Sequence, residues 1–436
     1  MGERGGGRAG VVDLSVGLPP RWRLRRQRGG ATVEALREQA LIEEARRRAR
    51  QRRLGNLAVL ALGLAVVVQV GFDGPGGAGG DRPNARPALL AAPAEGNGKL
   101  AIADSTGSLA VVNPDGSGPR ILSRCTGIIS DCRATEPAWS PDGMRLAFVR
   151  GQFGLRHMAM ALYVTDPDST RPRLLAHCGS CSSQNFATGI SWSPDATQIV
   201  FSASGGRPAV LSLFTVDVQG GVVRRLTDCD PSSCSDMDPD WSPDGQLIVF
   251  SRFAWYGASL YTVRPDGSGL TKITSEPSFA THPRWSPDGH VIAYMGYDYG
   301  SIADIYVVAG DGSRRRLLAS GSVPSWSPDG RRIVYFSTPP IAGAAGSEVW
   351  TVSVDGTDPH RLARFGCCVA GLAPPVWSPD GKQIAFGTSR QKPTLASHGI
   401  VSSTPKGGTF VVNSDGSGMT RISKLSAGAL SWQRVH

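Results

Sequence analysis

The sequence predicts an all-β fold, a seven-bladed β-propeller, and two observations predict it. The motif Trp-Ser-Pro-Asp-Gly recurs in one register, and each copy is followed by short apolar segments separated by turn residues. Spacings of 41 to 55 residues between the motif tryptophans, with four short strands per unit, are typical of propeller blades. The motif tryptophans are Trp139, Trp192, Trp241, Trp285, Trp326, Trp377 and Trp432.

The turn in the motif explains why the motif repeats. Pro presets the backbone for the second position of a tight turn, Asp bonds nearby backbone groups, and Gly accepts a positive φ. One copy ends in Ala196 instead of Gly, and only the Trp remains at Trp432. The motif aspartates are therefore expected to shape turns and not to act as catalytic acids. They are Asp142, Asp195, Asp244, Asp288, Asp329 and Asp380.

The two ends of the repeat region predict how the ring closes. Residues 98–122 supply three strands with no Trp strand before them, and residues 428–433 form a Trp strand with nothing after it. The last strand should therefore complete the first blade. Seven Trp strands and seven three-strand sets give seven blades within residues 98–436.

The region before the repeats has three parts. Residues 1–53 hold fourteen Arg, no Lys and six acids, with a helix expected over residues 31–53. Residues 54–72 carry no charge and are long enough for a single membrane pass. Residues 73–97 are a Gly-, Pro- and Ala-rich linker. A cleaved signal peptide is the alternative to an anchor, but its charged region is usually much shorter.

Charge and cysteine usage bear on the compartment and on the partners. The arginines before residues 54–72 favour a cytoplasmic N-terminus and an extracytoplasmic propeller. Of the net charge of +10, residues 1–53 hold +8, so the nearly neutral remainder gives no case for nucleic-acid binding. All eight cysteines follow the apolar segment, and disulfides are favoured over zinc. They form four neighbouring pairs: Cys125 and Cys132, Cys178 and Cys181, Cys229 and Cys234, Cys367 and Cys368.

The repeat resembles a known family. Trp-Ser-Pro-Asp-Gly, followed by Ile-Ala-Phe/Tyr, Ile-Tyr-Val-x-Asp-Gly and Arg-Leu, is similar to the TolB-type, WD-repeat-like propellers. The resemblance implies an envelope propeller that binds other proteins, including a peptidoglycan-associated lipoprotein. This chain differs in having seven expected blades where six are usual. It also has a membrane segment in place of a separate N-terminal α/β domain, so the resemblance extends to the fold and not to that partner.

Two groups of residues are candidate binding sites for an unidentified envelope protein or glycan. Aromatics outside the repeat register, namely Trp255, Tyr256, Tyr297 and Tyr299, lie in loops expected on the face that also carries the cysteines. The long loop 389–407 belongs to the same face. Glu136, Asp238 and His282 open the x-Pro-x-Trp stretch of three inner strands, where they are expected to form a polar rim of the channel.

Catalysis is the alternative function. The chain has no G-x-S-x-G, H-E-x-x-H or P-loop motif, and no cofactor or metal is expected. The stretch 236–240, DMDPD, has oxygen ligands at alternate positions but lacks the Gly and the distal Glu of an EF-hand. A hydrolase or lyase would require Glu136, Asp238 and His282 to converge on one point.

Overall fold

The computed structural model describes most of the chain from Asn97 to Arg434. The described residues are 97–104, 107–123, 132–153, 158–169, 171–178, 186–204, 210–229, 234–254, 256–275, 278–298, 302–337, 347–365, 374–388, 407–425 and 427–434. The helix expected over residues 31–53, the apolar segment 54–72 and the linker up to residue 96 lie outside them. Within the described ranges, no helix has the length and apolar character needed to cross a membrane.

The regular secondary structure of the described residues consists of β-strands, with turns between them. Five of the six sheets have four strands. The first sheet contains β1 (Leu100–Asp104), β2 (Leu109–Val112), β3 (Arg120–Ser123) and β28 (Ala427–Trp432). The next two contain β4 (Cys132–Trp139), β5 (Leu146–Phe153), β6 (Met158–Thr165) and β7 (Arg173–Cys178), then β8 (Phe186–Trp192), β9 (Gln198–Ser204), β10 (Leu211–Asp217) and β11 (Val223–Arg225). The last two contain β20 (Ser322–Trp326), β21 (Arg332–Ser337), β22 (Ser347–Ser353) and β23 (His360–Phe365), then β24 (Val376–Trp377), β25 (Gln383–Thr388), β26 (Gly408–Asn413) and β27 (Thr420–Ser423).

The sixth sheet has eight strands because two successive four-strand units touch. Its strands are β12 (Cys234–Trp241), β13 (Ile248–Ala254), β14 (Gly257–Val263), β15 (Thr271–Lys272), β16 (Phe279–Trp285), β17 (Val291–Tyr297), β18 (Asp304–Ala309) and β19 (Arg316–Ser320). One parallel pair, Ala258 with Phe279, joins β14 to β16. All other pairings in this sheet are antiparallel between neighbours, as in the remaining units.

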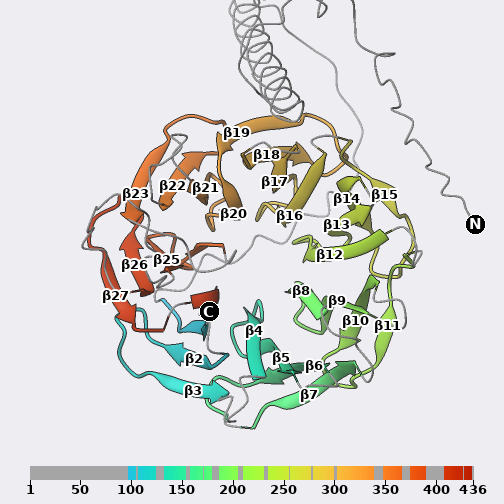
Figure 1. Cartoon of the computed structure of the whole chain (residues 1–436), viewed down its shortest axis with the longest axis horizontal. Coiled ribbons are helices and arrows are strands. Elements are labelled where there is room, and N and C mark those ends of the chain that lie inside the picture. The colour runs from blue at the N-terminus through green and yellow to red at the C-terminus, as the bar shows by residue number, and fades with distance from the viewer. Residues whose placement is uncertain are drawn as a thin grey trace, which may run out of the picture. The chain divides into compact units, whose positions relative to one another are not determined.

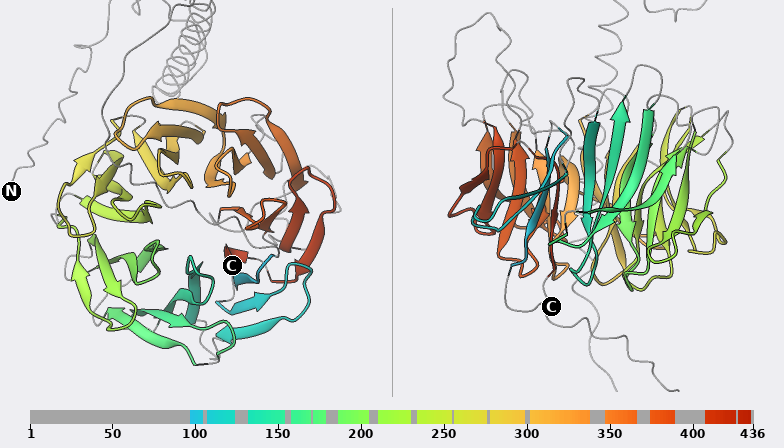
Figure 2. Two further views of the ribbon diagram at one scale, coloured as in Figure 1. Left: turned by 180° about the vertical axis from the view of Figure 1, so that it is seen from behind. Right: turned by 90° about the horizontal axis from the view of Figure 1, so that it is seen from below.

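The four-strand units stand side by side in a ring, which is the arrangement of a β-propeller (Figure 1). Strands β4, β8, β12, β16 and β20 lie nearest the centre, and β7, β11, β19 and β23 lie at the periphery. In the side view the strands run across the thickness of the ring (Figure 2). The sequence-predicted order of four strands per repeat is confirmed.

The ring closes through the last strand, as the sequence predicts. β28 pairs with β1 in antiparallel register from Leu100–Trp432 to Ala103–Ala429. Beyond the strand, the backbone N–H of Gln433 donates to the Lys99 carbonyl at 2.9 Å, and the Gln433 side chain accepts from the Lys99 N–H at 2.9 Å. The first and last described strands are therefore held side by side in the ring.

The motif turns are held by one repeated set of hydrogen bonds. In the turn after Trp285, the Ser286 hydroxyl donates to Asp288 at 2.5 Å and accepts from the Val291 N–H at 3.0 Å. Asp288 also accepts from the His290 N–H at 3.1 Å, and Gly289 has a φ of 73°. The same Ser-to-Asp bond occurs in the other five turns. The prediction that these aspartates shape turns is confirmed.

Each motif Trp packs into the boundary between its own unit and the preceding one. Trp192 is buried with Val149 and Leu162 of the preceding unit and with Ile199 of its own. Its indole N–H donates to the Ala138 carbonyl at 2.9 Å, one residue before the preceding motif Trp. The Trp therefore joins neighbouring units by apolar packing and, here, by a hydrogen bond.

Candidate functional site

The three polar residues predicted for the channel occupy one repeated backbone position. Glu136, Asp238 and His282 lie three residues before a motif Trp on β4, β12 and β16, with φ values of 52°, 53° and 53°. The strand register shifts at each of them. The Pro that follows each of them has no N–H to donate to the neighbouring strand. The resulting β-bulge changes the direction in which the side chain before the Pro points. These residues lie within the inner strands and not at their first residues.

Asp238 is the centre of this group. Its Oδ2 lies 3.8 Å from Nδ1 of His282, and Asp238 as a whole is only 6% exposed. The pKa of Glu136 is raised to about 7, first by burial and then by the nearby Asp238 carboxylate, with a smaller opposing effect from Arg284. Burial lowers the pKa of His282, which Asp238 opposes and Arg284 reinforces. The three predicted residues therefore interact with one another electrostatically, and His282 is mainly neutral at pH 7.

A glycine on the intervening strand makes room for this arrangement. Gly189 lies three residues before Trp192 on β8, the equivalent position in the unit between β4 and β12, with a φ of 94°. A Cβ added there would lie 3.1 Å from Cα of Asp238 and 3.3 Å from Cδ of Pro239. Both contacts are tighter than ordinary van der Waals contact, so the missing side chain permits the close approach of the Asp238 backbone.

Two further charged residues belong to the group, and sequence reasoning missed them. Asp240 and Arg284 both lie one residue before a motif Trp. Their shared position in the repeat is the sequence feature from which they could have been predicted. Asp240 accepts from the backbone N–H of Trp285 at 2.8 Å. Burial raises the pKa of Asp240, while the Arg284 charge and the Trp285 hydrogen bond oppose that rise.

We refer to Glu136, Asp238, Asp240, His282 and Arg284 as the inner-strand cluster. Chemically it combines carboxyl groups, a neutral imidazole and a guanidinium on three neighbouring or near-neighbouring inner strands. Among the residues that the structure describes, no group of three or more His, Cys, Asp and Glu side chains is arranged to hold a metal ion. The chemical groups of the cluster can exchange hydrogen bonds with a polar molecule, and its carboxyl and imidazole groups can exchange a proton.

The aromatic candidates are only partly described. Tyr256, between β13 and β14, is 88% exposed. Tyr297 instead stacks on Phe279, with ring centroids 4.8 Å apart and planes 5° apart. Trp255, Tyr299 and residues 389–406 of the long loop lie outside the described residues. Tyr256 is thus presented to solvent, while Tyr297 has a packing role between β16 and β17.

The comparison with known families fits this architecture. Residues 97–369 match the family model described as the TolB beta propeller domain, which is more than half of the chain. The chain belongs to this TolB beta propeller family. The sequence-based resemblance is thereby confirmed for residues 97–369.

Individual relatives of this TolB-type propeller match over limited stretches. An uncharacterised protein of Agrobacterium fabrum is 28% identical over 182 residues, 42% of this chain and 55% of that protein. An uncharacterised peptidase of Bacillus subtilis is 30% identical over 139 residues, 31% of this chain and 19% of that protein. The matches thus span less than two thirds of either relative. An oligogalacturonate lyase structure from Vibrio parahaemolyticus aligns with a TM-score of 0.51 at 14% identity, covering 75% of this chain and 86% of that chain, which shows a shared fold alone.

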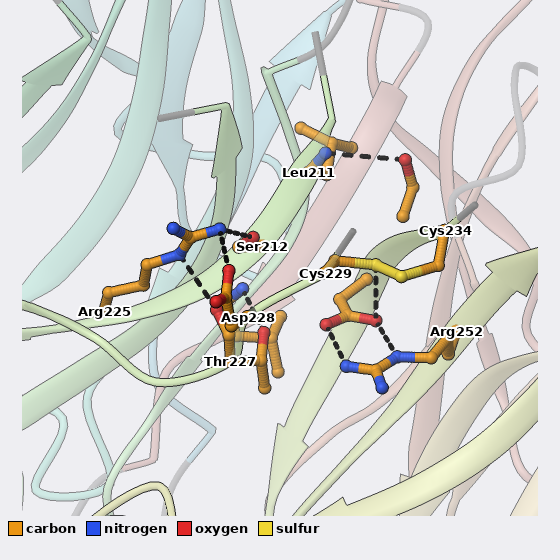
Figure 3. The surroundings of a disulfide bond; sticks show 11 residues. Leu211, Ser212, Arg225, Thr227, Asp228, Cys229, Cys234 and Arg252 are labelled. Carbon is orange, nitrogen blue, oxygen red and sulfur yellow. Dashed lines mark hydrogen bonds and ion pairs between the residues drawn. A yellow bond between two sulfur atoms is a disulfide. The ribbon is translucent and has the colours of Figure 1, made fainter. Parts of the chain in front are cut away.

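One of the four predicted cysteine pairs of this TolB-type propeller is described, and it is a disulfide. Cys229 and Cys234 are bonded, with Cα atoms 5.6 Å apart (Figure 3). Cys132 begins β4 and Cys178 ends β7, but the side chains of these two residues are not described. Cys125, Cys181, Cys367 and Cys368 lie outside the described residues. The prediction is confirmed for Cys229 with Cys234 and remains a prediction for the other pairs.

The disulfide adjoins an ion pair at the start of β12. Arg252 donates to both oxygens of Asp236, at 2.6 and 2.8 Å, and Asp236 is fully buried. The sulfur of Cys229 lies 3.9 Å from the same carboxylate. In the stretch 236–240, Asp236 is thus engaged by Arg252 and Asp240 by the Trp285 N–H, which leaves Asp238 as the carboxylate that faces His282.

Proposed function

We propose that this chain is a seven-bladed, membrane-tethered propeller that acts as a binding module or scaffold for an envelope protein or glycan. Residues 54–72 would provide the tether, with the N-terminus in the cytoplasm and the propeller outside. A disulfide in the described part supports an oxidising compartment. The ligand-binding site of this proposal is the inner-strand cluster, and exposed Tyr256 is an additional contact on the ring.

One observation carries the binding proposal. Asp238 is buried within the ring, yet no hydrogen bond to its carboxylate occurs among the described residues, and His282 Nδ1 is buried without a hydrogen-bond partner there. Buried polar groups in proteins are normally paired, and unpaired ones are costly. His282 Nδ1 therefore has hydrogen-bonding capacity left beside the Asp238 carboxylate, and a polar ligand that pairs with both is what this proposal places there.

The test is capture of envelope material by the full-length chain in a mild detergent. Asp238→Asn should lose at least tenfold of any specific capture, because it removes the charge at the centre of the cluster. Asp228→Asn is the matched control, since Asp228 pairs with Arg225 on the surface and its side chain is 88% exposed. Equal capture by the wild type and Asp238→Asn, with both folded, would overturn the cluster as the binding site.

A second function, an envelope hydrolase or lyase, rests on a separate observation. A pKa of about 7 makes Glu136 suited to general acid–base work near neutral pH, beside the neutral imidazole of His282 and the charge of Arg284. This alternative predicts products from envelope glycans or peptides incubated with the wild type, and a loss of at least a hundredfold in rate for Glu136→Gln. Product formation that is unchanged in Glu136→Gln, or absent in the wild type, would exclude it.

A further inference from the structure

One arginine of the sheet β4–β7 has a side chain that is left unpaired within the described part of the chain. Arg150 lies on β5 and is partly exposed as a whole, while its Nε is buried without a hydrogen-bond partner. Among the described residues, no carboxylate lies within 4.0 Å of its guanidinium, and no hydrogen bond to that group occurs. Because a buried donor without a partner costs free energy, the surroundings of Arg150 lack an acceptor.

The equivalent arginine of another unit shows which acceptor is missing. Arg150 and Arg252 each pair in register with the residue five positions before the motif Trp of the inner strand. For Arg252 this residue is Asp236, whose two oxygens accept from the guanidinium at 2.6 and 2.8 Å (Figure 3). For Arg150 the same residue is Ala134, and Ala161 of β6 lies in register on the other side. Neither alanine side chain can accept a hydrogen bond.

The aromatic side chains beside the two arginines are alike. Two residues before each arginine, a buried Phe stacks on a Tyr of the next strand: Phe148 on Tyr163 with ring centroids 5.6 Å apart, and Phe250 on Tyr261 with centroids 5.9 Å apart. The Cζ of Arg252 lies 5.0 Å from the centre of the Tyr261 ring. Within the described residues, no arginine lies in this way over the Phe148–Tyr163 pair. The second unit thus has the arginine and the aromatic pair but lacks the acid that holds the arginine in place.

We propose that Arg150 binds the carboxylate of an Asp or Glu side chain from an extended peptide segment of a partner. That carboxylate would take the place that Asp236 has beside Arg252, where an extended strand also presents the acid. A guanidinium offers donors in a planar fork that matches a carboxylate, and the resulting charge-assisted hydrogen bonds are short and strong. The partial exposure of Arg150 lets a partner side chain approach it. This site shares no residue with the inner-strand cluster and goes beyond the function proposed for that cluster.

The experiment is modification of the full-length chain in a mild detergent with phenylglyoxal, which reacts with free guanidinium groups, followed by peptide mapping. Arg150 should react at least fivefold faster than Arg252, because Arg252 is held by Asp236. Acetyl-Gly-Gly-Asp-Gly-Gly-amide at millimolar concentration should slow the labelling of Arg150 at least fivefold, and the same peptide with asparagine should not. Equal effects of the two peptides would overturn the inference. Protection by glucuronate but not by the aspartate peptide would indicate a glycan carboxylate and overturn the peptide ligand.

Supplying the missing acid within the chain is a second test. Ala134→Asp should pair with Arg150 as Asp236 pairs with Arg252, so it should slow the labelling of Arg150 at least fivefold with no peptide present. Ala134→Asn is the matched control, because it adds nearly the same bulk without the charge, and it should leave the labelling fast. Fast labelling in a folded Ala134→Asp variant would contradict the equivalence of the two arginines. Since Ala134 is fully buried, a variant that fails to fold leaves the decision to the peptide protection of the wild type.

Envelope capture separates this site from the inner-strand cluster. Arg150→Gln should lower the capture of a specific partner at least fivefold, whereas Arg171→Gln, at an exposed arginine of the same sheet, should not. If capture depends on Asp238 while the aspartate peptide does not protect Arg150, the cluster stands and the Arg150 site is wrong. If the peptide protects Arg150 while capture is insensitive to Asp238→Asn, the Arg150 site stands and the cluster is wrong. If neither occurs, both fail.

Discussion

The carboxylate of Asp240 accepts a hydrogen bond from the backbone N–H of Trp285, 2.8 Å from Oδ2, and so ties one inner strand to the next. The same contact is made by hydroxyl groups at two other boundaries. Ser191 accepts from the Trp241 N–H and Ser431 from the Trp139 N–H, both at 3.1 Å. Residues one position before a motif Trp thus supply acceptors for the backbone of the following unit.

Removing this acceptor should destabilise the propeller. Asp240→Ala leaves the Trp285 N–H buried and unpaired, and we expect the free energy of unfolding to fall by about 1 to 3 kcal/mol. Asp240→Asn keeps an oxygen acceptor and should lose less than about 1 kcal/mol. Urea unfolding measures both, with Ser191→Ala as the equivalent change at the Trp241 boundary. Equal losses for the Ala and Asn variants would show that the acceptor is not what matters.

The pH dependence of stability should report Glu136. Its pKa is about 7 in the folded state against an ordinary value of 4.5, so the folded state holds the proton more tightly. The free energy of unfolding should therefore fall as the pH rises from about 4.5 to about 7, and level off above that range. The wild type should lose up to about 3 kcal/mol more over this range than Glu136→Gln. Parallel stability–pH curves for the two proteins would contradict the raised pKa.

Alanine substitution at two glycines in the same turn position should lower the free energy of unfolding by different amounts. Gly143 and Gly289 have φ values of 67° and 73°, so Ala at either position adds strain of about 1 to 2 kcal/mol. A Cβ at Gly143 would also lie 1.8 Å from the carbonyl oxygen of Arg434, whereas at Gly289 the nearest atom is 3.6 Å away. Gly143→Ala should therefore be clearly more destabilising in urea. Similar losses of unfolding free energy in the two variants would show that the backbone at Arg434, after β28, can move away from the added Cβ without destabilising the fold.

The disulfide between Cys229 and Cys234 should stabilise its unit modestly. Closing so short a loop is expected to contribute about 2 kcal/mol through the unfolded state. Replacing both cysteines with serine should lower the free energy of unfolding by about that amount, measured without reductant. Peptide mapping of the unreduced wild type should find the two residues linked. Labelling of both thiols in the folded, unreduced protein would contradict the bond.

The sequence predicted the propeller because its determinants are local. The turn after Trp285 is specified by Ser286, Asp288 and Gly289, and the strand after it by a short apolar run, Val291–Tyr294, that can be recognised along the chain. The pairing of β28 with β1 was also predicted, since an incomplete first unit and an unpaired last strand leave one simple way to close. The sequence further singled out Glu136, Asp238 and His282, because they share one place in the repeat.

What the tertiary structure alone decided is which of these residues interact. β4 and β12 belong to units that are separated by a third unit. In that third unit, Gly189 lies against the Asp238 backbone, and its missing side chain permits this close approach. The inclusion of Asp240 and Arg284 likewise depends on burial and on contacts between neighbouring inner strands, which the spacing of residues along the chain does not record. Turn and strand preferences act between near neighbours in sequence, whereas electrostatic interactions act through space and follow the geometry of the folded ring.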